Sequence, residues 1–166
     1  MTPYERAKAE VGTLEWRDGH NPKVLAYFKD AKGNNISDDE TPWCAAFVGA
    51  MLERSGIQGT RALNARSYLE WGDVVDPKDA REGDILIFKR GTSSWQGHVA
   101  FWTGKQTANT YICLGGNQSD AVTDTGRYSK SKLLGVRRWP TQKVVQPTNI
   151  IATIITAIMR ALGVKK

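Results

Sequence analysis

The hydrophobic pattern of the chain changes once, near Gly72, and this change limits the possible folds more than any other feature. Before it, three segments begin with a capping residue followed by proline, the usual start of a helix: Thr2-Pro3, Asn21-Pro22 and Thr41-Pro42. After it, short β-branched and aromatic runs are bounded by Gly, Ser and Asn, as in antiparallel strands: residues 85–88, 98–102, 111–114 and 133–139. Helices followed by strands predict an α+β domain.

The third helical segment carries the first candidate for chemistry. Its apolar residues repeat at helical spacing, and we expect Thr41 to cap the helix and Gly56 to end it: Cys44, Phe47, Val48, Met51 and Leu52. A thiol at the third position of a helix faces unpaired N–H groups and the positive end of the helix dipole, which favours the reactive thiolate. The alternative is that Cys44 is a small buried residue on the apolar face.

The second candidate is His98, which follows a polar loop and begins a predicted strand. A cysteine at a helix start and a histidine at a strand start are suitable positions for a Cys–His pair, because both project from rigid elements. A strand-end histidine bonded to a local carbonyl is the alternative. The turn after residues 111–114 supplies Asn117 and Gln118, either of which can orient the imidazole unless this is an ordinary turn. The other histidine, His20, is expected on the surface.

Size and composition indicate one domain. The chain has 166 residues, 40% of them hydrophobic, and this length can form a core without disulfide or metal crosslinks. Its two cysteines cannot form a disulfide framework, and we expect Cys113 to lie in the core. No His-Glu-x-x-His spacing is present, and we expect no metal and no other cofactor. The first ten residues are mostly polar and show no secretory signal, so we expect the protein to stay in the cytoplasm where it is made.

Charge is distributed unevenly along the chain. All 17 acidic residues and 14 of the 23 basic ones lie in residues 1–124, whereas the last 42 residues contain nine basic residues and no acid. A basic end of this kind favours an anionic polymer or a membrane surface as partner. Zinc-finger spacings, basic heptad helices and aromatic RNA-binding strands are absent, so nucleic acid is not the expected partner.

The end of the chain is predicted to be a separate element. Pro140 and Pro147 bracket a linker, which divides the chain into a domain (1–140), the linker (141–147) and a C-terminal helix (148–166). On a helix, the five Ile of this last segment with Met159 and Leu162 cover one half of the circumference, while Arg160, Lys165 and Lys166 supply charge. We expect this amphipathic helix to contact an anionic surface; a strand, or a helix packed on the domain, is the alternative. It is too short to span a bilayer.

Four motifs together resemble a known superfamily. They are Thr-Pro-Trp-Cys-Ala-Ala-Phe-Val (41–48), Arg-Glu-Gly-Asp-Ile-Leu-Ile-Phe (81–88), Gly-His-Val-Ala-Phe (97–101) and Leu-Gly-Gly-Asn-Gln-Ser-Asp (114–120). In this order and spacing they are similar to the CHAP and NlpC-type cysteine peptidases and amidases, and most similar to CHAP-like bacteriophage endolysins. The resemblance covers roughly residues 10–140.

This resemblance implies a papain-like α+β fold that cleaves amide bonds in bacterial peptidoglycan. Cys44 is then the nucleophile, His98 the general base and Asn117 the residue that orients the imidazole, with the Cys44 backbone N–H contributing to the oxyanion hole. Many CHAP domains have a glutamate two residues before this asparagine, where this chain has Gly115, so Asp120 is a possible support for His98.

The predicted substrate contacts are the aromatic rings near the pair and the amide beside Asn117: Trp43, Trp95 and Gln118. The four other tryptophans are expected in the core.

The function expected from these residues is that of a phage endolysin: a Cys–His hydrolase of the stem peptide or of the muramoyl-alanine junction. It would wait in the host bacterial cytoplasm until it is released to the cell wall. A secreted antibacterial or wall-remodelling amidase and an inactive wall-binding module are the alternatives. The expected partners are peptidoglycan and, through the C-terminal helix, anionic lipid or lipopolysaccharide, and we expect a monomer.

Overall fold

The computed structural model describes residues 1–33 and 36–140, so the predicted linker (141–147) and C-terminal helix (148–166), with Arg160, Lys165 and Lys166, lie outside the described residues. The helices are α1 (Pro3–Ala9), α2 (Pro22–Asp30) and α3 (Cys44–Arg54), with short 3₁₀ turns η1 (Ala65–Glu70), η2 (Pro77–Asp79) and η3 (Lys130–Lys132). The strands are β1 (Asp73–Val75), β2 (Ile85–Lys89), β3 (Gly97–Gln106), β4 (Thr110–Gly115), β5 (Thr123–Ser129) and β6 (Leu133–Arg138). The predicted α+β class is confirmed.

Two of the three predicted helix starts are found where the capping residues place them. Thr2 and Glu5 form a capping box at α1, and the Asn21 side chain accepts a hydrogen bond from the Lys23 N–H at α2. The third prediction is wrong in detail, because α3 begins at Cys44 and its N-cap is Trp43. The hydroxyl that was expected to cap it, that of Thr41, instead donates to Asp38 at 2.9 Å.

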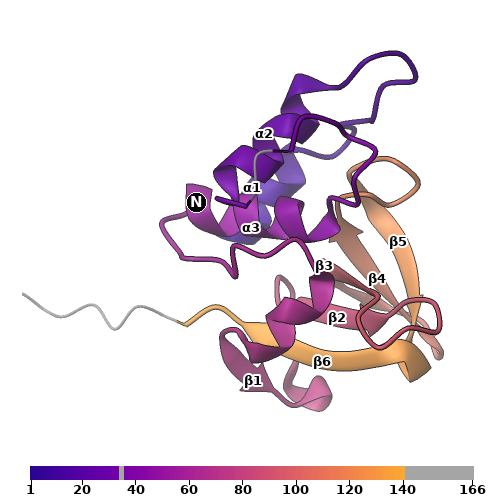
Figure 1. Ribbon diagram of the computed structural model, residues 1–166. Helices are drawn as coiled ribbons and strands as arrows, with labels where there is room; N and C mark the ends of the chain where they lie inside the picture. The colour runs from indigo at the N-terminus through magenta and orange to yellow at the C-terminus, as the bar shows by residue number, and fades with distance from the viewer. Residues whose placement is uncertain (34–35, 141–166) are drawn as a thin grey trace, which may run out of the picture.

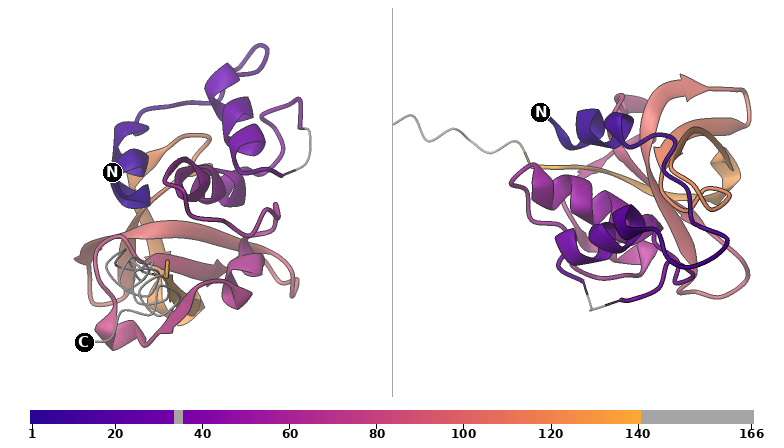
Figure 2. Two further views of the ribbon diagram at one scale, coloured as in Figure 1. Left: turned by 90° about the vertical axis from the view of Figure 1, so that its left-hand side faces the viewer. Right: turned by 90° about the horizontal axis from the view of Figure 1, so that it is seen from above.

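The strands form one antiparallel sheet in the order β1-β6-β2-β3-β4-β5, with α1, α2 and α3 grouped on one side of it (Figure 1). Both views of Figure 2 show the same separation of helices from strands. The sheet is strongly curled: Phe88 of β2 stacks on Tyr128 of β5 at 4.9 Å, although a flat sheet would hold strands three places apart at about 14 Å. The curl brings β5 back over β2 and β3.

Each face of the sheet has its own apolar cluster. The inner faces of α2 and α3 pack on the side chains that point to the helices, among them Ile85, Ile87, Val99 and Phe101. The alternate residues of the same strands form a second cluster inside the curl: Leu86, Phe88, Ala100, Trp102, Tyr111, Cys113 and Val136. Cys113 is fully buried there, where it was expected. No helix within residues 1–33 and 36–140 has the length and apolar character to span a membrane.

Candidate active site

Cys44 lies at the first residue of α3, against the sheet. Only 4% of its surface is exposed, and its sulfur is a free thiol. Backbone N–H groups of Ala45 and, across the interface, of Val99 in β3 lie close enough to the thiol to lower its pKa. No side chain caps α3, so the N–H groups of its first turn are available to an acceptor near the sulfur. Cys44 therefore has a helix start on one side and a strand backbone on the other.

The electrostatics of Cys44 differ from the prediction. Burial raises the pKa of the thiol and outweighs the backbone hydrogen bonds and the charge of Arg90, which lower it. The expectation that the helix start produces a thiolate is therefore wrong, because desolvation exceeds the effect of the helix terminus. A thiol in this state needs a base to remove its proton when it attacks.

His98 is the second residue of β3 and is 3% exposed. It pairs with Phe88 of β2, and paired residues share a face of the sheet, so its ring points into the curl rather than toward the helices. There it stacks on Tyr128 of β5 with ring centroids 4.5 Å apart and an interplanar angle of 15°. The imidazole is thus held between two strands that are far apart in the sequence.

The Gln118 side chain fixes the tautomer of His98. Its amide nitrogen donates to three acceptors, the Cys113 carbonyl at 3.3 Å and the carbonyl and hydroxyl of Thr123, both at 2.8 Å. The amide oxygen of Gln118 therefore faces His98 Nε2, at 3.3 Å. An amide oxygen only accepts, so Nε2 carries the hydrogen and Nδ1 keeps a free lone pair. The imidazole is arranged to act as a base through Nδ1.

Glycines make the space that Gln118 occupies. A Cβ on Gly126 of β5 would lie 2.5 Å from the Gln118 amide oxygen, and one on Gly116 would lie 2.4 Å from the Trp43 ring. The loop also holds Asn117, Ser119 and Asp120 at positive φ, a conformation that non-glycine residues rarely adopt. The close packing of Gly116 on the Trp43 ring and the three left-handed residues together direct the Gln118 side chain toward His98.

Burial controls the protonation of His98. It lowers the pKa of the imidazole to about 4, although the hydrogen bond that His98 donates to Gln118 raises it, and the nearby charge of Arg90 lowers it further. The neutral Gln118 amide offers no negative charge to stabilise an imidazolium. His98 is therefore an unprotonated base at neutral pH.

Cys44 lies against β3 at Val99, the residue that follows His98. The backbone N–H of Trp102 donates to the Asp84 carbonyl, on the side of β3 that faces β2. Backbone N–H groups of successive residues in a strand point to opposite sides. Val99 lies three residues before Trp102, so its N–H points to the side of β3 that faces β4. The pairing of β3 with β4 begins only at Phe101, so the backbone of β3 at Val99 has no partner in β4. The Cys44 thiol lies against this unpaired stretch. No hydrogen bond links the thiol and the imidazole in the part of the chain that the structure describes; such contacts often tighten only with substrate bound.

Two predicted site residues do not contact His98. Of the two residues that the sequence offered to orient the ring, Gln118 makes the contact and Asn117, which the family resemblance favoured, does not. Asp120, proposed as a support, has an exposed side chain, and its backbone carbonyl accepts the Glu15 N–H at 2.8 Å. The identity of the orienting residue is thus corrected to Gln118.

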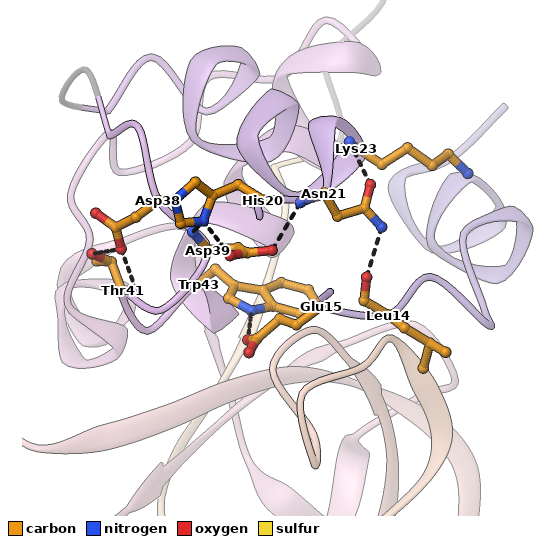
Figure 3. A network of polar contacts seen from close by, with 9 residues as sticks. All are labelled: Leu14, Glu15, His20, Asn21, Lys23, Asp38, Asp39, Thr41 and Trp43. Carbon is orange, nitrogen blue, oxygen red and sulfur yellow. Dashed lines mark hydrogen bonds and ion pairs between the residues drawn. The ribbon is translucent and has the colours of Figure 1, made fainter. Parts of the chain in front are cut away.

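The two tryptophans predicted to line a groove lie in opposite environments. Trp43 is fully buried, stacked on Tyr27 with centroids 5.8 Å apart, and its indole N–H donates to Glu15 (Figure 3). A ring without exposed surface cannot contact substrate, so that prediction is wrong; the Trp43 ring anchors the start of α3. Trp95 is 68% exposed in the loop before His98, and it does not line the cavity described next.

A cavity of about 820 Å³ opens beside His98 and Gln118, between the end of β2 and the length of β5. This wall, including Tyr128, was not predicted from the sequence, because β5 is largely polar. The sequence signal that could have predicted β5 is the spacing of Thr123, Thr125 and Arg127, because side chains two residues apart lie on one face of a strand. Within the described residues, no group of three or more His, Cys, Asp or Glu side chains is arranged to hold a metal ion.

Comparisons with known proteins give a partial likeness to solved structures. No known protein family matches the chain, and no curated protein matches it. Among solved structures, it is similar to a Staphylococcus aureus protein described as similar to a lipoprotein of the NLP/P60 family, with 16% sequence identity and a TM-score of 0.49. The match covers 85% of this chain and 41% of that one, so this chain spans less than half the length of that protein.

Proposed function

We propose that this protein is a cysteine hydrolase that cleaves an amide bond of bacterial peptidoglycan, as a phage endolysin does. The observation that carries the proposal is the anchored amide of Gln118, which leaves His98 as a neutral base with a free Nδ1 lone pair, one residue before the Val99 backbone that lies against Cys44. The four motifs that resemble the CHAP and NlpC-type enzymes supply the substrate class. Amide cleavage is the chemistry that a thiol, a base and an N–H-lined helix start perform together.

The reaction follows from the protonation states. As the Cys44 sulfur attacks the amide carbon, its proton moves to Nδ1 of His98, and the imidazolium keeps its Nε2–H bond to Gln118. The carbonyl oxygen gains negative charge, which the free N–H groups at the start of α3, that of Cys44 among them, stabilise. The proton on Nδ1 then passes to the leaving amine. Water, deprotonated by the same imidazole, attacks the thioester carbon; the carbon–sulfur bond breaks, the acid is released, and the imidazolium returns a proton to the Cys44 sulfur.

The cleavage assay uses isolated sacculi and mass spectrometry of the released fragments. Wild-type protein is expected to release fragments with new termini at one bond, either in the stem peptide or at the muramoyl-alanine junction. Cys44→Ala should release none, whereas the matched variant Cys113→Ala, checked for folding by circular dichroism, should retain cleavage. Equal release by Cys44→Ala and wild type would exclude the mechanism, and no release by wild type from sacculi of several chemotypes would favour an inactive wall-binding module.

The alternative enzymatic role is a secreted antibacterial or wall-remodelling amidase with the same site. Lysis distinguishes it from an endolysin: expression together with a membrane-permeabilising factor should lyse the producing cell if the protein is an endolysin. A remodelling amidase should instead alter cell shape or separation without rapid lysis.

The basic C-terminal segment supports a membrane-contacting role. Residues 148–166 combine an apolar Ile set with Arg160, Lys165 and Lys166 and contain no acid. Deletion of residues 148–166 should reduce binding to vesicles of anionic lipid and leave cleavage of isolated sacculi unchanged. Equal vesicle binding by both proteins would exclude this role.

A further inference from the structure

The cavity beside His98 is strongly basic. Four cationic side chains line it, Lys89 and Arg90 from the end of β2 and the residue after it, Arg127 from β5, and Lys132 from the turn after β5. No Asp or Glu is among its lining residues. Side-chain hydroxyls complete the wall: Thr110, Thr123, Thr125 and Ser129. A concave site with charge of one sign concentrates field lines and attracts a ligand of the opposite charge.

These four cations have no carboxylate partners within residues 1–33 and 36–140, unlike other basic residues of the fold. Arg138, for example, binds Asp84 at 2.7 Å, and Arg61 binds Glu53 at 2.8 Å. No ion pair involves the four cations of the cavity in the described part of the chain, and residues 34–35 and 141–166 contain no Asp or Glu that could supply one. The basic charge of the cavity is therefore available to a ligand.

The cavity is continuous with the catalytic residues. His98 and Gln118 are part of its lining. The charge of Arg90 acts on both members of the pair, since it lowers the pKa of Cys44 and that of His98. A negative group bound to Arg90 would thus lie close to the bond that the thiol attacks.

We propose that this cavity is a subsite that binds the carboxylate groups of an acidic peptide on one side of the scissile amide. The inference rests on the proposed function, because the stem peptide of peptidoglycan supplies such carboxylates. The guanidinium groups of Arg90 and Arg127 offer paired donors that match a carboxylate, while Lys89 and Lys132 add charge. The enzyme then prefers stem peptides with free carboxylates over those in which the carboxylates are amidated.

The test measures binding to full-length Cys44→Ala, so it does not depend on turnover. The probes are a synthetic tetrapeptide, L-Ala-γ-D-Glu-L-Lys-D-Ala, and the same peptide with its carboxylates as carboxamides, titrated by calorimetry at low salt. The free acid should bind about tenfold or more tightly than the carboxamide, and Arg90→Gln with Arg127→Gln should remove that difference. The matched control, Lys29→Gln with Lys105→Gln, removes two exposed charges outside the cavity. This control should preserve the difference in affinity between the free acid and the carboxamide.

The outcomes separate this inference from the proposed function. Charge-dependent binding without cleavage of sacculi supports the subsite and rejects the hydrolase. Cleavage with equal affinity for acid and carboxamide supports the hydrolase and overturns the subsite. Displacement of the peptide by inorganic phosphate at the same concentration also overturns it, since the cavity would then be a general anion site.

Discussion

The two histidines of this chain have opposite environments. His20 is 43% exposed at its side chain, and its Nδ1 lies 2.7 Å from a carboxylate oxygen of Asp39, which is fully buried (Figure 3). His98 is buried and its ring faces the neutral amide of Gln118. The Asp39 hydrogen bond raises the pKa of His20, whereas burial lowers that of His98 to about 4.

The partners of the two rings show which histidine is suited to catalysis. The carboxylate of Asp39 raises the pKa of His20 and holds this ring in a structural contact. It belongs to a network in which Asp39 also accepts the Asn21 N–H at 2.9 Å, next to the Glu15 contact that anchors Trp43 (Figure 3). An amide partner orients His98 without adding charge, so this ring stays free to accept a proton from a thiol.

Exchanging the partner of His98 should have the largest effect. In Gln118→Glu a carboxylate faces the ring, which should raise the pKa of His98 by about 1 to 3. The acid limb of kcat/KM, expected near pH 4 for wild type, should then move to higher pH by the same amount. The pH profile of peptide cleavage measures the limb, and NMR titration of the ring measures the pKa. Asn117→Asp is the control, because the structure gives Asn117 no contact with the ring.

The reciprocal exchange at His20 should affect stability alone. In Asp39→Asn the pKa of His20 should fall toward its ordinary value of 6.5, and the melting temperature should drop by about 2 to 10 °C. For Asp39, burial raises the pKa, but hydrogen bonds from Asn21 and His20 outweigh it, so the pKa lies below the ordinary 3.8.

The pH dependence of the stability lost in Asp39→Asn follows from the opposite pKa shifts of Asp39 and His20. The contribution of Asp39 is lost as pH falls through its lowered pKa, and that of His20 as pH rises through its raised pKa. The destabilisation in Asp39→Asn should therefore be largest between about pH 4 and 6.5, close to the ordinary pKa values of an aspartate and a histidine. Thermal melts across this range measure it. A uniform loss at every pH, or an activity per folded molecule that falls with stability, would contradict the assignment.

Local sequence rules predicted the elements that carry Cys44 and His98. Caps and prolines located α1 and α2, and apolar runs located β2, β3, β4 and β6. They did not locate β5, whose residues are mostly polar because one side of this strand lines a cavity. Its Tyr128 contacts His98 only because the sheet curls, which depends on the whole fold.

The choice between Asn117 and Gln118 also depends on the tertiary structure. Both were candidates, and three left-handed residues around Gln118, with the space left by Gly126, decide which side chain enters. Trp43 was misplaced for a similar reason, since its partners Glu15 and Tyr27 come from other segments of the chain. Burial likewise reversed the expected shift of the Cys44 pKa. Sequence spacing identifies chemical groups, but not their desolvation.

His98 acts as the base for Cys44 in the proposed mechanism, and alkylation of the two cysteines tests this role. Iodoacetamide rates, followed by mass spectrometry near neutral pH, should be faster at Cys44 than at Cys113, which is fully buried with a raised pKa. In His98→Gln the rate at Cys44 should fall about 10²-fold or more, with Cys113 unchanged. The same Cys44 rate in wild type and His98→Gln would contradict this role.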